Sequence, residues 1–384
     1  MSRRMLACAA ALAAACGGAR VPPPAPDAAA RLVVVGDAVL TPGPGVRGRP
    51  DVGGLSGAYY DPGEARLYAV SDDRERPRLL VFDVEVAPAV RLRARRVVPL
   101  QLPHEDRRTL DAEGVAPAPG GRLFVSSEGD AADPAAPAAG IHEYRRDGRF
   151  VRSLPLPRTW LGDGRRAGMR ANGSIEALSV SPSGSRLFAA AESSLRQDGP
   201  EASFDGGALV RLLVYDLKDA GPPREFAYRT DPMPRPDDYE NPAGDGGVSE
   251  VLALGETGLL VLERIFVRER ALVSPRAANT IRIYRTALDP AAEVTGRASL
   301  ADGPPPAVLA KTLVLDLAEV AAELSEPLDR LENFEAMTFG PRLPDGSPTL
   351  LLLSDDNFSS RQVTALVVLR WSTPNAQRPT SQGR

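Results

Sequence analysis

The chain has 384 residues, with 46 lysines and arginines against 50 aspartates and glutamates and a net charge near −4. This balance gives no general attraction to nucleic acid, so we expect no nucleic-acid partner. With only two histidines and two cysteines in the chain, the composition argues against a zinc or iron site built from these residues.

The N-terminus predicts an export signal. Arg3 and Arg4 precede an apolar run, residues 5–15, that is too short to span a bilayer as a helix. Small residues directly before Cys16 close this run, which is similar to a bacterial lipoprotein signal. We therefore expect residues 1–15 to be removed and Cys16 to carry lipid. The alternative is an ordinary secretory signal with an incidental cysteine.

Residues 16–30 are rich in proline, glycine and alanine, which is typical of a tether between an anchor and a folded domain. Lipid on Cys16 would place the protein in the bacterial cell envelope, as a periplasmic or outer-membrane lipoprotein. Contact with the membrane would then be through the lipid anchor only. Both cysteines lie before residue 17, so the predicted domain over residues 31–372 contains no disulfide.

Residues 31–372 contain short apolar runs broken by turn residues, which predict β-strands. Residues 31–40 form a first run without a partner of their own. Five units follow, and in each a turn such as Asp61-Pro-Gly63 joins a first run to a second. The second runs cover residues 67–72, 123–128, 187–192, 260–263 and 350–355. The best helix candidate is residues 317–324, and residues 373–384 form a polar tail.

Four units contain two further strand-like runs, but the fifth contains only one, at residues 364–371. Residues 31–40 can supply the missing strand. The sequence therefore predicts an all-β fold: a single β-propeller of five four-stranded blades, closed by the N- and C-terminal strands over residues 31–372. Six blades are the alternative, if residues 264–310 contain an additional unit.

One carboxylate pattern recurs in the five units and is the main evidence for function. The first run carries Ser56 near its start, and the other four carry Glu113, Glu176, Glu250 and Glu335. In each of the five units, the second run ends in an acidic residue. These acids are Asp72, Glu128, Glu192, Glu263 and Asp355, with Asp356 directly after the last.

In a propeller, the first strand of each blade lines a central channel, and the second strand is antiparallel to it. The start of the first strand and the end of the second therefore lie side by side, so both sets of acids should meet at one mouth of this channel. Like charges this close require raised pKa values, arginines or a bound cation. Ligand sets made only of oxygen suit Ca²⁺, with Mg²⁺ as the alternative. The acids could instead be structural, bonded to backbone N–H groups or paired with Arg74, Arg264 or Arg361.

The motifs around these acids are similar to those of the phytase-like, or esterase-like-activity-of-phytase, domain family. They include Gly53-Gly-Leu-Ser-Gly57 and Asn333-Phe-Glu335-Ala-Met, the latter followed by Leu353-Ser-Asp355-Asp356-Asn357-Phe358. The resemblance covers about residues 50–372. It implies an exported propeller with phosphoesterase or esterase chemistry, in which Glu113, Glu176, Glu250 and Glu335 would be metal ligands or bases. Arg264 or Arg361 would steady a phosphate.

Two other functions remain open at this stage. The first is a non-enzymatic binding propeller of the cell envelope, because a fold does not determine a function. The second is a metal-dependent lactonase-type hydrolase. We expect a monomer whose partner is a small-molecule ester or an envelope ligand.

Overall fold

The computed structural model describes residues 31–40, 52–103, 109–129, 138–162, 165–219, 221–270 and 276–372. The predicted signal peptide (1–15), Cys16, the tether (16–30) and the polar tail (373–384) lie outside the described residues. Within the described ranges, no helix is both long enough and apolar enough to cross a membrane.

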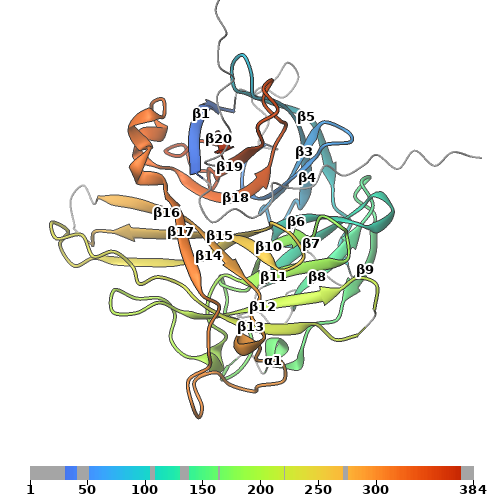
Figure 1. The fold of residues 1–384 in the computed structure, drawn as a ribbon, viewed down its shortest axis with the longest axis vertical. Coiled ribbons are helices and arrows are strands. Elements are labelled where there is room, and N and C mark those ends of the chain that lie inside the picture. The colour runs from blue at the N-terminus through green and yellow to red at the C-terminus, as the bar shows by residue number, and fades with distance from the viewer. Residues whose placement is uncertain are drawn as a thin grey trace, which may run out of the picture.

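The strands form five antiparallel sheets of four strands each, arranged as a five-bladed propeller (Figure 1). Blade 1 contains β2 (Leu55–Asp61), β3 (Arg66–Ser71), β4 (Arg78–Glu85) and β5 (Arg91–Pro99). Blade 2 contains β6 (Ala112–Ala118), β7 (Arg122–Gly129), β8 (Ala138–Tyr144) and β9 (Phe150–Leu154). Blade 3 contains β10 (Ile175–Val180), β11 (Arg186–Ala191), β12 (Leu209–Asp216) and β13 (Arg224–Arg229).

Blade 4 contains β14 (Ala243–Ala253), β15 (Gly258–Arg268), β16 (Ala277–Ala287) and β17 (Lys311–Asp316). Blade 5 contains β18 (Asn333–Phe339), β19 (Thr349–Asp355), β20 (Ala365–Ser372) and β1 (Arg31–Val39). The prediction of five four-stranded blades is confirmed. The six-bladed alternative is wrong, because β15, β16 and β17 pair within one sheet and leave no additional unit in residues 264–310.

The first strand of the chain closes the ring. β1 pairs antiparallel with β20, from Arg31 opposite Ser372 to Val39 opposite Ala365. This is the pairing that the unpartnered strands at the two ends predict. β1 covers the outer side of β20, so blade 5 has four strands like the other blades.

Helical structure is confined to short turns. They are α1 (Arg158–Leu161) and the 3-10 turns η1 (Pro119–Gly121), η2 (Arg196–Asp198), η3 (Pro290–Ala292), η4 (Leu317–Glu319), η5 (Ala321–Glu323) and η6 (Leu328–Arg330). The expected helix at residues 317–324 is therefore wrong as one element. It forms two 3-10 turns, η4 and η5.

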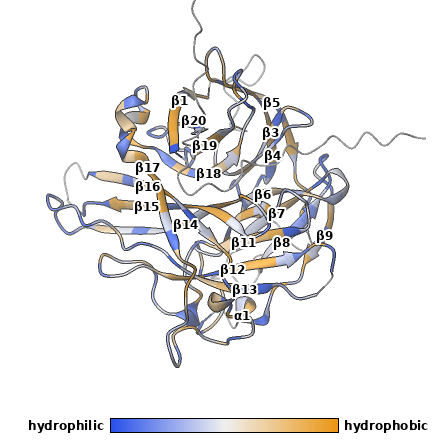
Figure 2. Ribbon diagram, viewed as in Figure 1, coloured by the Kyte–Doolittle hydropathy of each residue, from blue (hydrophilic) through white to orange (hydrophobic). Residues whose placement is uncertain are grey.

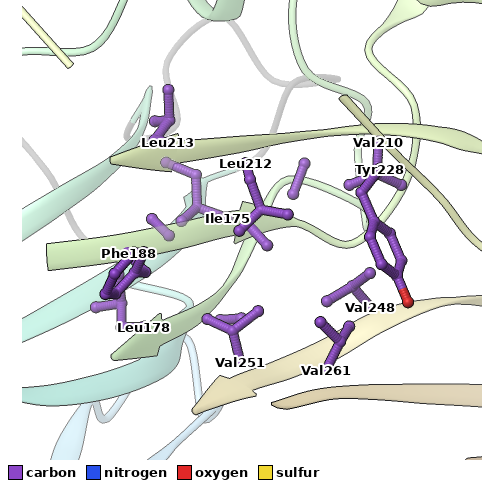
Figure 3. Close-up of a cluster of buried hydrophobic side chains, with 14 of the residues drawn as sticks. Ile175, Leu178, Phe188, Val210, Leu212, Leu213, Tyr228, Val248, Val251 and Val261 are labelled. Carbon is purple, nitrogen blue, oxygen red and sulfur yellow. The ribbon is translucent and has the colours of Figure 1, made fainter. Parts of the chain in front are cut away.

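The core lies between neighbouring blades, and apolar stretches run along many of their strands (Figure 2). Between blades 3 and 4, Ile175 and Leu178 of β10 lie near Phe188 of β11 and Val251 of β14 (Figure 3). Each of these four side chains is at most 3% exposed. Burial on this scale contributes about 1.5–3 kcal/mol per large side chain, so the blades form a rigid frame for the residues at the channel mouth.

Candidate functional site

A β-bulge in each inner strand sets the geometry of the channel mouth. The pairing register skips one residue in blades 1, 3, 4 and 5, and two residues, Glu113 and Gly114, in blade 2. A bulge redirects the side chain of the unpaired residue. The single bulged residues are Ser56, Glu176, Ser249 and Glu335.

A second set of equivalent positions lies on the neighbouring strand of each blade. The residue before the bulge pairs with a residue of that strand, and the equivalent position is the residue directly after this partner. In blade 1, for example, Leu55 pairs with Ser71, and Asp72 follows. The other blades place Glu128, Glu192, Arg264 and Asp355 at this position. Four blades therefore supply a carboxylate here, and blade 4 supplies a guanidinium.

All of these positions except Ser249 line one cavity of about 1070 Å³ at the mouth of the channel. Eleven acidic side chains and three arginines of the described residues line it. The acids are Asp72, Asp73, Glu75, Asp111, Glu113, Glu128, Glu176, Glu192, Glu335, Asp355 and Asp356, and the arginines are Arg74, Arg76 and Arg264. The wall is therefore far more acidic than the chain as a whole.

Most of the predicted site residues meet in this cavity. They are Glu113, Glu176, Glu335, Asp72, Glu128, Glu192, Asp355, Asp356 and Arg264. Three of the predicted residues, Glu250, Glu263 and Arg361, do not line it.

The expected placement of Glu250 in the acidic ring is wrong. Ser249 occupies the bulge of blade 4, and Glu250 is the next residue, paired with Leu262. Its carboxylate is 1% exposed and accepts the backbone N–H groups of Leu178 (3.2 Å) and Val251 (3.0 Å). Burial raises the pKa of Glu250 well above its usual value. Glu250 therefore links the inner strands of blades 3 and 4.

Glu263 is displaced in the same way. It lies one residue before the equivalent position, and successive side chains of a strand point to opposite faces. Its carboxylate accepts from the Tyr228 hydroxyl (2.6 Å) and pairs with Lys311 Nζ (2.6 Å). The expected placement of Arg361 beside the ring is also wrong, because Arg361 is exposed and does not line the cavity.

Burial and mutual repulsion hold protons on the ring. Burial raises the pKa of Asp72 to about 7, and the charges of Glu335 and Asp111 add to the effect. Burial also raises the pKa of Glu192 to about 8, although Arg264 opposes the shift. The pKa values of Glu113 and Glu176 are raised too, by burial first and then by neighbouring carboxylates. A positive charge entering the cavity would relieve this repulsion.

Backbone contacts keep several of the carboxylates in place. Glu128 Oε1 accepts the N–H groups of Gly173 (2.6 Å) and Ser174 (2.7 Å), which fixes β7 against the neighbouring blade. Asp356 Oδ1 accepts the N–H of Gly54 (2.9 Å). Gly54 has φ of +62°, and a Cβ atom there would lie 2.1 Å from Asp72 Oδ1. Only glycine allows this close approach.

The cavity offers two groups of carboxylates close enough to hold an ion. Asp111, Glu113 and Glu128 form one triad, and Glu128, Glu176 and Glu192 form the other. In each triad, one oxygen from every member lies within 4.8 Å of the others. Glu128 belongs to both.

A known protein family matches most of this sequence. Residues 50–358 match the family model of the phytase-like family, described as "Esterase-like activity of phytase". The chain belongs to the phytase-like family. No curated protein matches the sequence.

Several solved structures are similar to this phytase-like chain, and their sequence identity to it is low. The PQQ-bound aldose sugar dehydrogenase of Streptomyces coelicolor is 10% identical, with a TM-score of 0.38 over 91% of this chain and 100% of that one. The endo-arabinase of Bacteroides thetaiotaomicron is 9% identical, with a TM-score of 0.40 over 84% and 96%. A gluconolactonase of Xanthomonas campestris is 11% identical, with a TM-score of 0.31 over 83% and 72%. Similarities this weak do not indicate a function for this chain.

The donor set of the phytase-like mouth fits a hard divalent cation. All the candidate ligands are oxygens, which Ca²⁺ and Mg²⁺ prefer. In addition, Asp72 Oδ1 is buried and has no hydrogen-bond partner among the described residues. An oxygen in this state favours a proton or an ion beside it.

The cavity also contains residues that were not among the predicted site residues. Asp111 precedes Glu113 by two residues, and Arg74 pairs with it at 2.7 Å. Asp111 stands in the motif Asp111-Ala-Glu113-Gly-Val, so its place two residues before a predicted ligand was the available signal. Phe358, half exposed with φ of +50°, borders the phytase-like cavity beside Asp356. Phe358 ends the motif Leu353-Ser-Asp355-Asp356-Asn357-Phe358, but it was not among the predicted site residues because an aromatic ring is not a metal ligand.

Proposed function

We propose that this phytase-like propeller is a cation-dependent hydrolase of ester bonds, acting at the acidic mouth. One observation carries the proposal: acidic side chains from several blades converge on one cavity and include two triads that could each hold an ion. The substrate class, a phosphoric or a carboxylic ester, is part of the test.

The residues divide by position. Asp111, Glu113, Glu128, Glu176 and Glu192, the members of the two triads, would hold the cation. A divalent cation there supplies Lewis-acid chemistry by stabilising the negative charge that develops on an ester oxygen. Calcium is the first candidate and magnesium the second, because both bind through oxygen.

Asp72 is the proposed general base. It lines the cavity but belongs to neither triad. Its Oδ1 has no hydrogen-bond partner among the described residues, so this oxygen is free to accept a proton from an attacking water. A pKa of about 7 keeps a useful fraction of the carboxylate ionised near neutral pH.

The proposal includes the working location. We propose that lipid on Cys16 holds the protein in the cell envelope, where its partner is a small ester of that compartment. A monomer suffices for this role, because one chain supplies all the residues of the cavity.

The test is an activity panel on cation-depleted protein, with Ca²⁺ or Mg²⁺ added back. The substrates are p-nitrophenyl phosphate, p-nitrophenyl acetate and a gluconolactone. Glu128→Gln should abolish the cation-dependent rate, because Glu128 belongs to both triads. The exposed Glu319, changed to Gln, is the matched control.

The outcomes separate the candidate functions. Phosphate release supports a phosphoesterase, acetate release a carboxylesterase, and ring opening a lactonase-type hydrolase. Cation binding without turnover of any substrate would contradict the hydrolase and leave the binding propeller of the envelope. A rate that is unaffected by chelator would contradict the role of the cation.

A further inference from the structure

Arg264 interrupts the fivefold pattern of the mouth. In blades 1, 2, 3 and 5 the position after the bulge partner carries a carboxylate, whereas blade 4 carries Arg264. The strand pairing of β14 with β15 fixes this equivalence, since Val248 pairs with Glu263 and Arg264 follows. The blade therefore presents a permanent positive charge where its neighbours present negative ones.

The guanidinium connects the acids on both sides of blade 4. Arg264 Nη2 lies 3.2 Å from Glu192 of the blade 3 edge and 3.1 Å from Glu335 of blade 5. Nη1 lies 2.9 Å from Asp245 on β14. The side chains of Arg264, Glu192 and Glu335 are each at most 15% exposed, so these two pairs are only weakly screened, whereas Asp245 is 71% exposed. Both terminal nitrogens are engaged by carboxylates.

The third nitrogen of the guanidinium, Nε, takes no part in these ion pairs. Arg264 Nε is buried and has no hydrogen-bond partner among the described residues. An arginine that binds a phosphate usually offers a free pair of N–H groups in its planar fork. The contacts of Arg264 match an internal counter-ion better than a phosphate ligand.

We propose that Arg264 is the resident counter-ion of the ring: it occupies the blade 4 side permanently and confines the exchangeable cation to the side of blades 2 and 3. This inference rests on the proposed function for the existence of that cation. The exchangeable ion would bind among the two triads, and Glu192, which already pairs with Arg264, would lie between the two positive charges. Arg264 would be a positioning residue and would make no contact with substrate.

The proposal gives opposite expectations for charge removal on the two sides. Arg264→Gln leaves Glu192 and Glu335 facing each other without a positive charge, which creates a place for a second ion. Arg264→Lys keeps the charge and should not create it. Glu335→Gln should leave the native ion in place, because Glu335 belongs to neither triad.

The experiment counts Mn²⁺ bound per chain by equilibrium dialysis, on full-length folded protein at fixed pH and ionic strength. We expect Arg264→Gln to bind one more ion than wild type, and Arg264→Lys to bind the same number. The control is Arg342→Gln, at an exposed arginine away from the cavity. A purely structural arginine would not produce a gain of an ion when it is removed.

Equal ion counts for wild type and folded Arg264→Gln would overturn the proposal. If Arg264→Gln does not fold, Glu335→Gln and Glu128→Gln decide instead. Glu128→Gln should weaken Mn²⁺ binding roughly tenfold or more, whereas Glu335→Gln should leave it within about twofold. Loss of the ion from Glu335→Gln overturns the proposal. Because ion counting requires no turnover, a protein that hydrolyses nothing defeats the proposed function and still tests Arg264.

Discussion

Removing the cation should make the propeller less stable as the pH rises, and Asp72 shows why. Its pKa is raised from 3.8 to about 7 in the folded protein. Below about pH 4 the carboxyl group is protonated in both the folded and the unfolded chain. Between pH 4 and 7 only the folded chain holds the proton, so each step upward in pH favours the unfolded chain.

The size of the effect follows from the shift. About three pKa units correspond to about 4 kcal/mol of unfolding free energy, an upper bound because neighbouring acids share the titration. Glu192, with a pKa of about 8, extends the loss to higher pH. A cation at a hundredfold excess over its dissociation constant returns about 2.7 kcal/mol. With an unfolding entropy of about 0.7 kcal/mol/K for this many residues, that is about 4 °C in Tm.

The assay is thermal unfolding from pH 5 to 8.5, in a chelator and in excess Ca²⁺. We expect Tm in the chelator to fall across this range, and the Ca²⁺ curve to stay higher by an amount that grows with pH. Asp72→Asn should flatten the chelator curve, while Asp219→Asn, at an exposed aspartate, should not. A chelator curve that is level or rises from pH 5 to 8.5 would refute the reasoning.

Three further predictions concern other parts of the chain. Cys16→Ser should move the protein from the membrane fraction to the soluble fraction, and unchanged membrane association would contradict lipidation. Glu250→Gln should leave the Ca²⁺ response of Tm unchanged, whereas Glu250→Ala should cost about 1–3 kcal/mol in urea unfolding, because two buried N–H groups lose their acceptor; equal stability of the two variants would show that this acceptor is not needed. Gly54→Ala should lower kcat for the ester that the activity panel identifies, since the new methyl group displaces Asp72 Oδ1, the proposed base; a native rate in the folded variant would contradict that contact.

The blade architecture was accessible from the sequence because it rests on local signals. Turn residues such as Asp61-Pro-Gly63 separate apolar runs, and the unpartnered runs at the two ends require each other. The predicted helix at residues 317–324 failed because its apolar residues serve two 3-10 turns. Short apolar runs give little power to distinguish these forms.

The site was only partly accessible, and blade 4 shows the reason. Ser249-Glu250 and Glu263-Arg264 each place an acid one residue away from the equivalent position. Matching by residue type selects the acids, whereas the backbone register selects Ser249 and Arg264. A one-residue slip moves a side chain to the other face of a strand, so the pairing partners were needed to place these residues.

The pairing of β1 with β20 also determines at which end of the propeller β1 begins. β19 ends at Asp355 in the mouth, and β20 runs back to Ser372 on the opposite face. β1 begins there, with Arg31 opposite Ser372. Arg31, where the described chain begins, therefore lies at the end of the propeller opposite the acidic cavity. Lipid on Cys16 would attach the protein to the membrane at that end, through a tether of at most about 50 Å. Substrate would then reach the cavity from the aqueous side and not from the bilayer.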